Sequence, residues 1–163
     1  MVPPPLRKYP YILPIQSRWP DSDFYHHINN VQYYIYADTC INTFLIANCG
    51  LEPANPTASP IGLMIASSCS FYAPLHFPSV IQTGLCVRKM GTSSVEYEIG
   101  IWEEPKEGKE GVLAAVVRCT HVFVDRETRV PMGKGANGGK GLPEEMRKGL
   151  EKLVVKEERE SRL

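Results

Sequence analysis

The chain has 163 residues, of which 18 are Lys or Arg and 18 are Asp or Glu, so its formal net charge is zero. A chain of this length is most economically one domain with a tail. Because it is neutral, it lacks the broad positive field that would hold a nucleic-acid backbone or an anionic membrane, and any anionic ligand must be bound by local contacts.

The five cysteines show neither C-x-x-C spacing nor the even, clustered count of a disulfide framework. They indicate small buried side chains in a reducing compartment. No stretch approaches the roughly 20 apolar residues that span a bilayer, and the N-terminal residues lack the apolar core of a secretory signal. We therefore expect a cytoplasmic location, with an organelle matrix as the alternative, and neither membrane nor nucleic acid as a partner.

The first half of the chain predicts a strand, a loop and a long helix. Residues Tyr9–Trp19 are typical of a short strand, which Pro14 places at or near a sheet edge. Residues Asn30–Cys49 contain neither Gly nor Pro and carry apolar side chains at helical spacing. Asn29 is a good N-cap, and Gly50 stands where a helix C-cap is expected. We predict a helix over 30–49 with a wide buried face.

Four extended segments follow, separated by turns whose spacing suits an antiparallel meander. They are Ile61–Tyr72, Val80–Met90, Ser93–Trp102 and Val112–Asp125. A strand, a long helix and then four strands predict an α+β fold, with one helix against one face of a five-stranded sheet. Such a sheet has a single covering helix and invites a second subunit.

The C-terminal part differs in composition from the rest. Residues Arg126–Gly141 are rich in Gly and Lys and indicate a spacer, while Leu142–Leu163 has the pattern of a charged amphipathic helix. We therefore expect a main domain over residues 1–131, followed by a spacer and tail helix over residues 132–163.

One loop concentrates the reactive groups. The segment before the long helix carries two carboxylates and two imidazoles, at Asp21, Asp23, His26 and His27. The first N–H groups of a helix lack internal acceptors, and the helix dipole favours negative charge there. Acid/base groups and free backbone donors therefore converge beside Asn30, an arrangement suited to a reaction that passes through an oxyanion.

The same loop begins a series of motifs that runs in register from about Tyr9 to Pro131. The motifs are Arg18-x-x-Asp21-x-Asp23-x-x-x-His27-x-Asn29-Asn30-x-x-Tyr33-x-x-Tyr36-x-Asp38, Tyr72-x-Pro74-Leu75, Gly91-Thr92-Ser93-Ser94 and Val124-Asp125-Arg126-Glu127-Thr128-Arg129-Val130-Pro131. Together they resemble the hotdog-fold acyl-CoA thioesterases of the 4-hydroxybenzoyl-CoA thioesterase type. The resemblance implies a hotdog fold, in which an antiparallel five-stranded sheet wraps around one long central helix, with the tail helix added at the C-terminus.

The resemblance also implies roles for individual residues. In such enzymes a loop acid attacks the thioester carbonyl or activates water, and a backbone N–H at the start of the helix polarises the carbonyl oxygen. Position by position, these groups are Asp23 and the backbone N–H of Asn30, and His27 is expected to orient the loop or to transfer a proton. The expected substrate contacts are Tyr25, His26, Ser93, Ser94, Arg88 and Lys89, the last two toward the phosphates of coenzyme A.

Two further acids and two departures from the family pattern bear on the site. Asp21 is expected to pair with Arg18, and Asp38 to be structural, with a direct catalytic role as the alternative for each acid. His26 stands where the family usually has Gly, so the chain is expected to need φ > 0 at this position. After Pro74-Leu75 the family commonly shows Gly-Asp, whereas this chain continues with residues 76–79, His-Phe-Pro-Ser.

The function that the resemblance implies is hydrolysis of an acyl-CoA thioester to the free acid and coenzyme A. It requires neither a metal nor an organic cofactor, and it implies a homodimer or homotetramer. Two alternatives stay open, a non-catalytic acyl-ligand-binding hotdog protein and a hotdog hydratase or dehydratase. The sequence does not specify the acyl group, nor whether the carrier is coenzyme A or an acyl-carrier protein.

Overall fold

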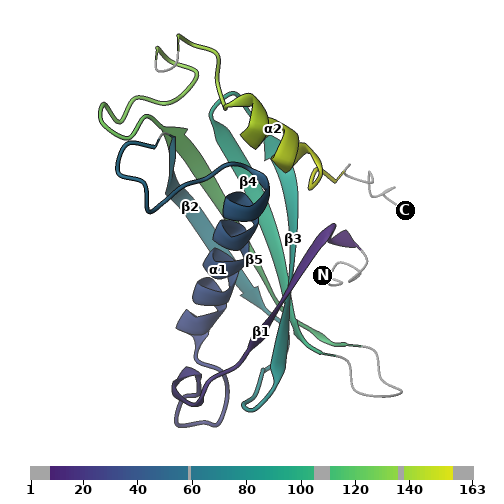
Figure 1. Cartoon of the computed structure of the whole chain (residues 1–163). Helices are drawn as coiled ribbons and strands as arrows, with labels where there is room; N and C mark the ends of the chain where they lie inside the picture. Colours follow the sequence, from purple (N-terminus) through teal and green to yellow (C-terminus); the bar gives the residue numbers. More distant parts are fainter. Residues whose placement is uncertain (1–7, 59, 105–110, 136–137, 156–163) are drawn as a thin grey trace, which may run out of the picture.

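A computed structural model of the chain describes residues 8–58, 60–104, 111–135 and 138–155 (Figure 1). In chain order its elements are β1 (Tyr11–Gln16), the 3-10 helix η2 (Trp19–Asp21), α1 (Asn30–Asn48), β2 (Ile61–Phe71), β3 (Val80–Met90), β4 (Ser94–Glu103), β5 (Leu113–Val124) and α2 (Glu144–Glu151). Every predicted strand is present. β1 is shorter than predicted, because the chain after Ser17 turns into η2.

The strands form one five-stranded sheet in the order β1-β3-β4-β5-β2, and all neighbouring pairs are antiparallel. β2 follows α1 in sequence but pairs with β5, so it forms one edge of the sheet and β1 forms the other. Figure 1 shows α1 lying along one face of the curved sheet. The predicted α+β hotdog fold is confirmed.

Both ends of α1 follow from local chemistry. The Asn29 side chain accepts a 3.1 Å hydrogen bond from the N–H of Val31, which satisfies a helix donor that has no internal acceptor. At the other end, Gly50 adopts φ 64°, and the N–H of Leu51 donates to the carbonyl of Leu45. The predicted helix is therefore confirmed, and it ends one residue earlier than expected.

The core lies between α1 and the sheet. α1 buries a stripe of side chains, namely Tyr33, Tyr36, Ala37, Cys40, Ile41, Phe44 and Leu45. Alternate residues of β4, Val95, Tyr97, Ile99 and Ile101, belong to the same cluster and have no solvent exposure. Full burial of a large aliphatic side chain is worth about 1.5–3 kcal/mol, so this contact holds α1 and the loop before it in place.

Tyr9, which precedes β1, covers part of the sheet face opposite α1. Tyr9 crosses Gly84 and Gly100, where a Cβ atom would stand within 2.7 Å of the Tyr9 side chain at either position. Beside it, the buried Glu98 carboxylate accepts hydrogen bonds from Arg118 Nε at 2.9 Å and Arg88 Nη1 at 3.0 Å. Burial raises the pKa of Glu98, but the neighbouring cations outweigh this effect and leave that pKa below its ordinary value.

α2 packs onto the same core as α1. Met146 and Leu150 are buried in the main cluster, and Gly149 allows close approach because a Cβ there would collide with the Asn48 carbonyl. The predicted tail helix over 142–163 was too long, because the chain leaves the helix after Glu151 and the Leu153 carbonyl accepts from Val87 on β3. Residues 156–163 of that prediction lie outside the described residues. Within the described parts, neither helix has the length and apolarity that crossing a membrane requires.

Candidate active site

The Asp23 loop, residues 21–29 between η2 and α1, closes on itself around the Asp23 side chain. Asp23 Oδ1 accepts hydrogen bonds from the N–H of Tyr25 at 2.8 Å and the N–H of His27 at 3.2 Å. The N–H of Asp23 donates to the His27 carbonyl at 2.8 Å. Within the described chain, no donor is hydrogen-bonded to Oδ2. One carboxylate oxygen therefore holds the loop, and the other is left without a donor from the described residues.

Two backbone hydrogen bonds anchor this loop to the rest of the molecule. The N–H of Asn29 donates to the Asp21 carbonyl at 2.8 Å, and the N–H of Ile28 donates to the Leu75 carbonyl at 2.8 Å. Ile28 itself is buried in the main core. The loop is therefore fixed between the start of α1 and the turn that follows β2.

Asp21 supports the loop from inside. Its carboxylate is fully buried and accepts from Arg18 Nη2 at 2.8 Å and from Tyr36 Oη at 2.8 Å. Burial raises the pKa of Asp21, but the hydrogen bonds from Arg18 and Tyr36 outweigh burial and lower it. Burial and the bond to Asp21 raise the pKa of Tyr36. The predicted pairing of Asp21 with Arg18 is confirmed.

His26 has φ 62°, in the left-handed region that favours Gly. The expectation that the chain needs φ > 0 here is therefore confirmed, and a non-Gly residue in this conformation is strained by ~1 kcal/mol or more. The His26 side chain is exposed, next to Tyr25, whose side chain is 80 % exposed. Both predicted substrate contacts are therefore accessible beside Asp23.

Asn30 is the first residue of α1, and its N–H is one of the donors that a helix leaves without an internal acceptor. Within the described residues this N–H makes no hydrogen bond, and Asn30 is exposed. The positive end of the helix dipole lies at the same point. A carbonyl oxygen placed here would be polarised by the start of the helix.

His76 lies beside the Asp23 loop, although no motif of the sequence marks it as a site residue. Its ring lies 5.4 Å from the His27 ring between centroids, at an interplanar angle of 77°. Glu103 Oε1 accepts from the His76 N–H at 2.9 Å and lies 3.6 Å from His76 Nδ1. The departure from the family pattern at residues 76–79 was the available signal, but sequence alone gave no reason to place this turn beside the loop.

Phe24, within the Asp23 loop, is a second residue that no sequence motif marks. Its side chain is 101 % exposed although it directly follows Asp23, and the side chain of Trp19 nearby in sequence is 80 % exposed. Large aromatic side chains usually bury most of their area, so two exposed aromatic side chains close in sequence to Asp23 make this surface a candidate for contact with a ligand or another chain.

The remaining predicted contacts lie elsewhere within one protomer. Ser93 and Ser94 stand at the turn between β3 and β4, at the end of the sheet away from the Asp23 loop (Figure 1). Arg88 pairs with Glu98 on the outer face, and Lys89 follows it on β3. The structure therefore brings Asp23, His27 and Asn30 together with Tyr25 and His26, and it leaves these four residues outside that group.

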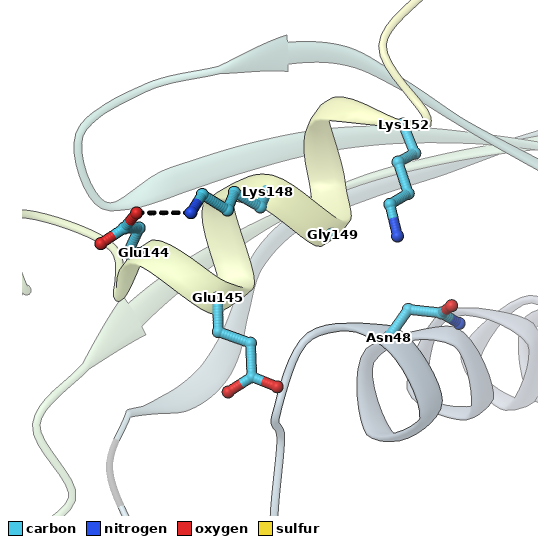
Figure 2. Close-up of a pocket in the computed structure, with 6 residues that line it drawn as sticks. All are labelled: Asn48, Glu144, Glu145, Lys148, Gly149 and Lys152. Atoms are coloured by element: carbon cyan, nitrogen blue, oxygen red, sulfur yellow. Dashed lines mark ion pairs between the residues drawn. The ribbon is translucent and has the colours of Figure 1, made fainter.

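A hollow of about 560 Å³ lies at the other end of α1, as Figure 2 shows. It is lined by Asn48, Glu144, Glu145, Lys148, Gly149 and Lys152. Glu144 and Lys148 form an ion pair of 2.6 Å along α2. None of the predicted site residues lines this hollow.

β2 leaves an apolar edge open. Its side chains are exposed on both faces, including Leu63, Met64 and Ile65, the last at 64 %. Val31 and Ile35 are exposed on α1. An exposed, apolar edge strand of this kind is a ready site for pairing with another chain.

The chain matches known proteins over most of its length. Residues 17–152, which include the Asp23 loop, both α-helices and β2–β5, match the thioesterase-like superfamily. The crystal structure of the PA5185 protein from Pseudomonas aeruginosa strain PAO1 is 38 % identical, with 91 % of this chain and 94 % of that chain covered and a TM-score of 0.79. None of the curated proteins matches.

More distant structures share the fold. Slr0204, a 1,4-dihydroxy-2-naphthoyl-CoA thioesterase from Synechocystis, is 15 % identical, with 86 % of this chain and 94 % of that chain covered and a TM-score of 0.70. SAV2348 from Staphylococcus aureus, solved in complex with CoA, is 13 % identical, with 89 % and 85 % covered and a TM-score of 0.73. Because the family match covers residues 17–152, which is most of the chain, the chain belongs to the thioesterase-like superfamily.

Proposed function

We propose that this protein hydrolyses an acyl-CoA thioester to the free acid and coenzyme A. The observation that carries the proposal is the Asp23 carboxylate, held through one oxygen by the N–H groups of Tyr25 and His27 and open at the other. It stands beside the start of α1, where Asn30 offers a backbone donor. An acid and an oxyanion donor at one place are what acyl transfer requires.

In the proposed reaction, Asp23 accepts a proton from water while the water oxygen adds to the thioester carbonyl carbon. The alternative is direct attack by the carboxylate, followed by hydrolysis of the resulting anhydride. In both routes the carbonyl oxygen gains negative charge and accepts a hydrogen bond from the Asn30 N–H. The carbon–sulfur bond then breaks, and the thiolate takes up a proton and leaves as the thiol of coenzyme A.

The choice of a coenzyme A thioester is supported by what related folds bind. Slr0204 is a CoA thioesterase by name, and SAV2348 was solved with CoA. Both share the fold with this chain at low identity, so they support coenzyme A as the carrier and do not specify the acyl group. The five free cysteines suit a reducing compartment, and we place the protein in the cytoplasm on that ground.

We also propose that the working form is a homodimer or homotetramer in which a second copy covers the β2 edge. Apolar side chains on β2 and on α1 support this proposal, with Ile65 at 64 % and Val31 at 62 % exposed. A second copy would also bring strand residues toward the Asp23 loop, since Ser93 and Ser94 lie at the far end of their own protomer. The site would then lie between protomers.

A panel of acyl-CoA thioesters, with short and long aliphatic chains and aryl groups, tests the proposed function. We expect at least one member to release free thiol, measured with a thiol-reactive dye, at a rate that saturates with substrate. Ligand binding without thiol release would favour the non-catalytic alternative. Water addition to an enoyl substrate without thiol release would favour the hydratase, and either result would contradict the proposal.

A further inference from the structure

We infer that His76, held by Glu103, is a positioning residue for His27 in the reaction proposed above. The inference rests on that proposed function and extends it to two residues outside the family motifs. Within the described residues, no hydrogen bond or ion pair joins His76 to Asp23, so the effect we infer for His76 passes through the His27 ring.

The backbone places the two histidines side by side. Ile28, which follows His27, donates its N–H to the carbonyl of Leu75, which precedes His76, at 2.8 Å. Both segments are fixed at this point, because Ile28 and Leu75 are buried in the core at 2 % and 1 % exposure. The ring contact at 5.4 Å therefore follows from buried neighbours on both segments of the chain.

Glu103 holds the backbone of His76 by a hydrogen bond and lies close to its half-exposed ring. One carboxylate oxygen, Oε1, accepts the His76 N–H at 2.9 Å and lies 3.6 Å from His76 Nδ1. At 3.6 Å the carboxylate forms no direct hydrogen bond to the ring, but its charge attracts the Nδ1 side of the imidazole and so biases the orientation of the ring. Glu103 lies at the end of β4 and is paired with Ile81 on β3, so the oxygen is presented from the sheet.

The consequence for His27 is a restricted side chain. Its N–H donates to Asp23 Oδ1, so the backbone of His27 is part of the acid's support, while its ring is on an exposed loop. Without the His76 ring, the His27 ring would sample several rotamers. With it, the imidazole is held in one orientation for proton transfer or for holding the loop.

The charged and titratable groups around the pair come from three elements. Asp23 lies on the loop and Glu103 on β4, and Tyr33 on α1 is within electrostatic reach of both acids. Burial raises the pKa of Tyr33, so it stays neutral. The pair therefore faces two carboxylates and a neutral phenol.

Four variants test this role. His76→Ala removes the ring, His76→Phe keeps an aromatic ring but loses the nitrogens, and Glu103→Gln removes the charge. Glu104→Gln is the matched control, because Glu104 is exposed on the same strand end and its carboxylate accepts from Gln82 at 3.4 Å. Each variant is measured for kcat and KM in thiol release across pH, for Tm, and for the His27 ring signals in NMR spectra of the unliganded protein.

We expect His76→Ala to lower kcat about tenfold with KM changed less than about twofold, since His27 is misplaced but substrate binding is not. His76→Phe should recover part of the loss, because ring packing is restored. Glu103→Gln should lower kcat a few-fold and alter the pH profile, because the charge that orients His76 is gone. Glu104→Gln should match the wild type in every measurement.

The inference is overturned if His76→Ala and Glu103→Gln both keep wild-type kcat and pH profile, even where Asp23→Asn is inactive. Should His76→Ala fail to fold, His76→Phe and Glu103→Gln carry the same test. If the wild type releases no thiol, the proposed function fails. The NMR signals of the His27 ring still test whether His76 positions that ring. His27 ring signals that move no more in His76→Ala than in Glu104→Gln would then refute the positioning role.

Discussion

The hydroxyl of Tyr36 donates a 2.8 Å hydrogen bond to the buried carboxylate of Asp21, and this bond joins the core face of α1 to the loop that carries Asp23. Tyr36 is 2 % exposed and Asp21 is fully buried, so the bond is formed away from water. A charge-assisted bond in such a place is stronger than one at the surface.

Tyr36→Phe should therefore destabilise the fold. The change removes the donor but keeps the ring, and a bond to a charged group contributes about 2 kcal/mol. The expected result is a Tm lower by roughly 4–8 °C in a thermal melt at fixed protein concentration. Tyr34→Phe is the control, because Tyr34 is 37 % exposed on the same helix. Equal melting of the two variants would contradict the role given to the Tyr36 bond.

Asp23→Asn should abolish activity while the fold survives. The amide is nearly isosteric, and its oxygen can still accept from Tyr25 and His27, but it can neither attack nor take a proton. We expect thiol release to fall by roughly two orders of magnitude or more, with an unchanged Tm. A variant within a few-fold of wild-type turnover would remove Asp23 from the mechanism.

Stability should fall in acid. The folded state lowers the pKa of Asp21 and of Glu98 from ordinary values of 3.8 and 4.5, so both groups hold protons more weakly when the chain is folded. Their contribution is full above these ordinary values and is lost as pH falls through the lower folded values. Tm measured from pH 7 to pH 2 should therefore drop below about pH 4.5.

Glu98→Gln should flatten part of that acid dependence and lower Tm at pH 7, because the amide cannot pair with the cations around it. The exposed Glu104→Gln should keep the wild-type slope. If Glu98→Gln and wild type lose stability in parallel from pH 7 to pH 2, Glu98 is not a source of the dependence.

His26→Gly should raise Tm. Gly adopts φ 62° without the steric cost that a Cβ brings, but its greater conformational entropy in the unfolded chain offsets part of this relief, so the net gain is about 1 kcal/mol at most. His26→Ala is the matched control, since it also removes the imidazole but keeps the Cβ. If the imidazole contacts substrate, both variants should raise KM; wild-type KM in both would exclude that role.

Ile65→Lys should disrupt the proposed assembly. Ile65 is 64 % exposed on the β2 edge, and a charge there opposes burial against a second copy. We expect a smaller particle by light scattering, together with lost activity. Ile12→Lys, on the other edge strand where Ile12 is 47 % exposed, should leave size and activity unchanged. A fully active monomer of Ile65→Lys would contradict the shared site.

The local part of the architecture could be predicted from the sequence. The helix from Asn30 has apolar spacing and marked ends, and its start agrees with the structure. The five strands are bounded by Gly, Pro and charged residues, so the sequence predicted each of them. The cap at Asn29 and the pairing of Arg18 with Asp21 are contacts between near neighbours in sequence.

What the sequence did not predict depends on distant pairings. The contact of His27 with His76 requires the bond from Ile28 to Leu75, 47 residues apart by their numbers, and no periodicity encodes it. The burial of Glu98 could not be predicted either, since an acid in a strand is usually exposed and its partners come from β3 and β5. The tail helix was predicted too long because the residues that follow Glu151 form backbone hydrogen bonds to Val87 on β3 and leave the helix.

The two oxygens of the Asp23 carboxylate are chemically identical in a free side chain, but this loop distinguishes them. Oδ1 is held by two backbone donors, and turning the carboxylate over would break both bonds. An isotopic label can therefore report which oxygen reacts. In heavy-oxygen water, direct attack by Asp23 followed by hydrolysis of the anhydride at the Asp23 carbonyl carbon would place an unlabelled oxygen in the first molecule of product acid and leave the label on Asp23. Attack by water on the thioester carbonyl would instead label the product acid from the first turnover and leave Asp23 unlabelled. Because Oδ1 is held by two backbone donors, direct attack would use Oδ2, and Asp23 would gain at most one heavy oxygen over many turnovers, which mass spectrometry of the protein measures.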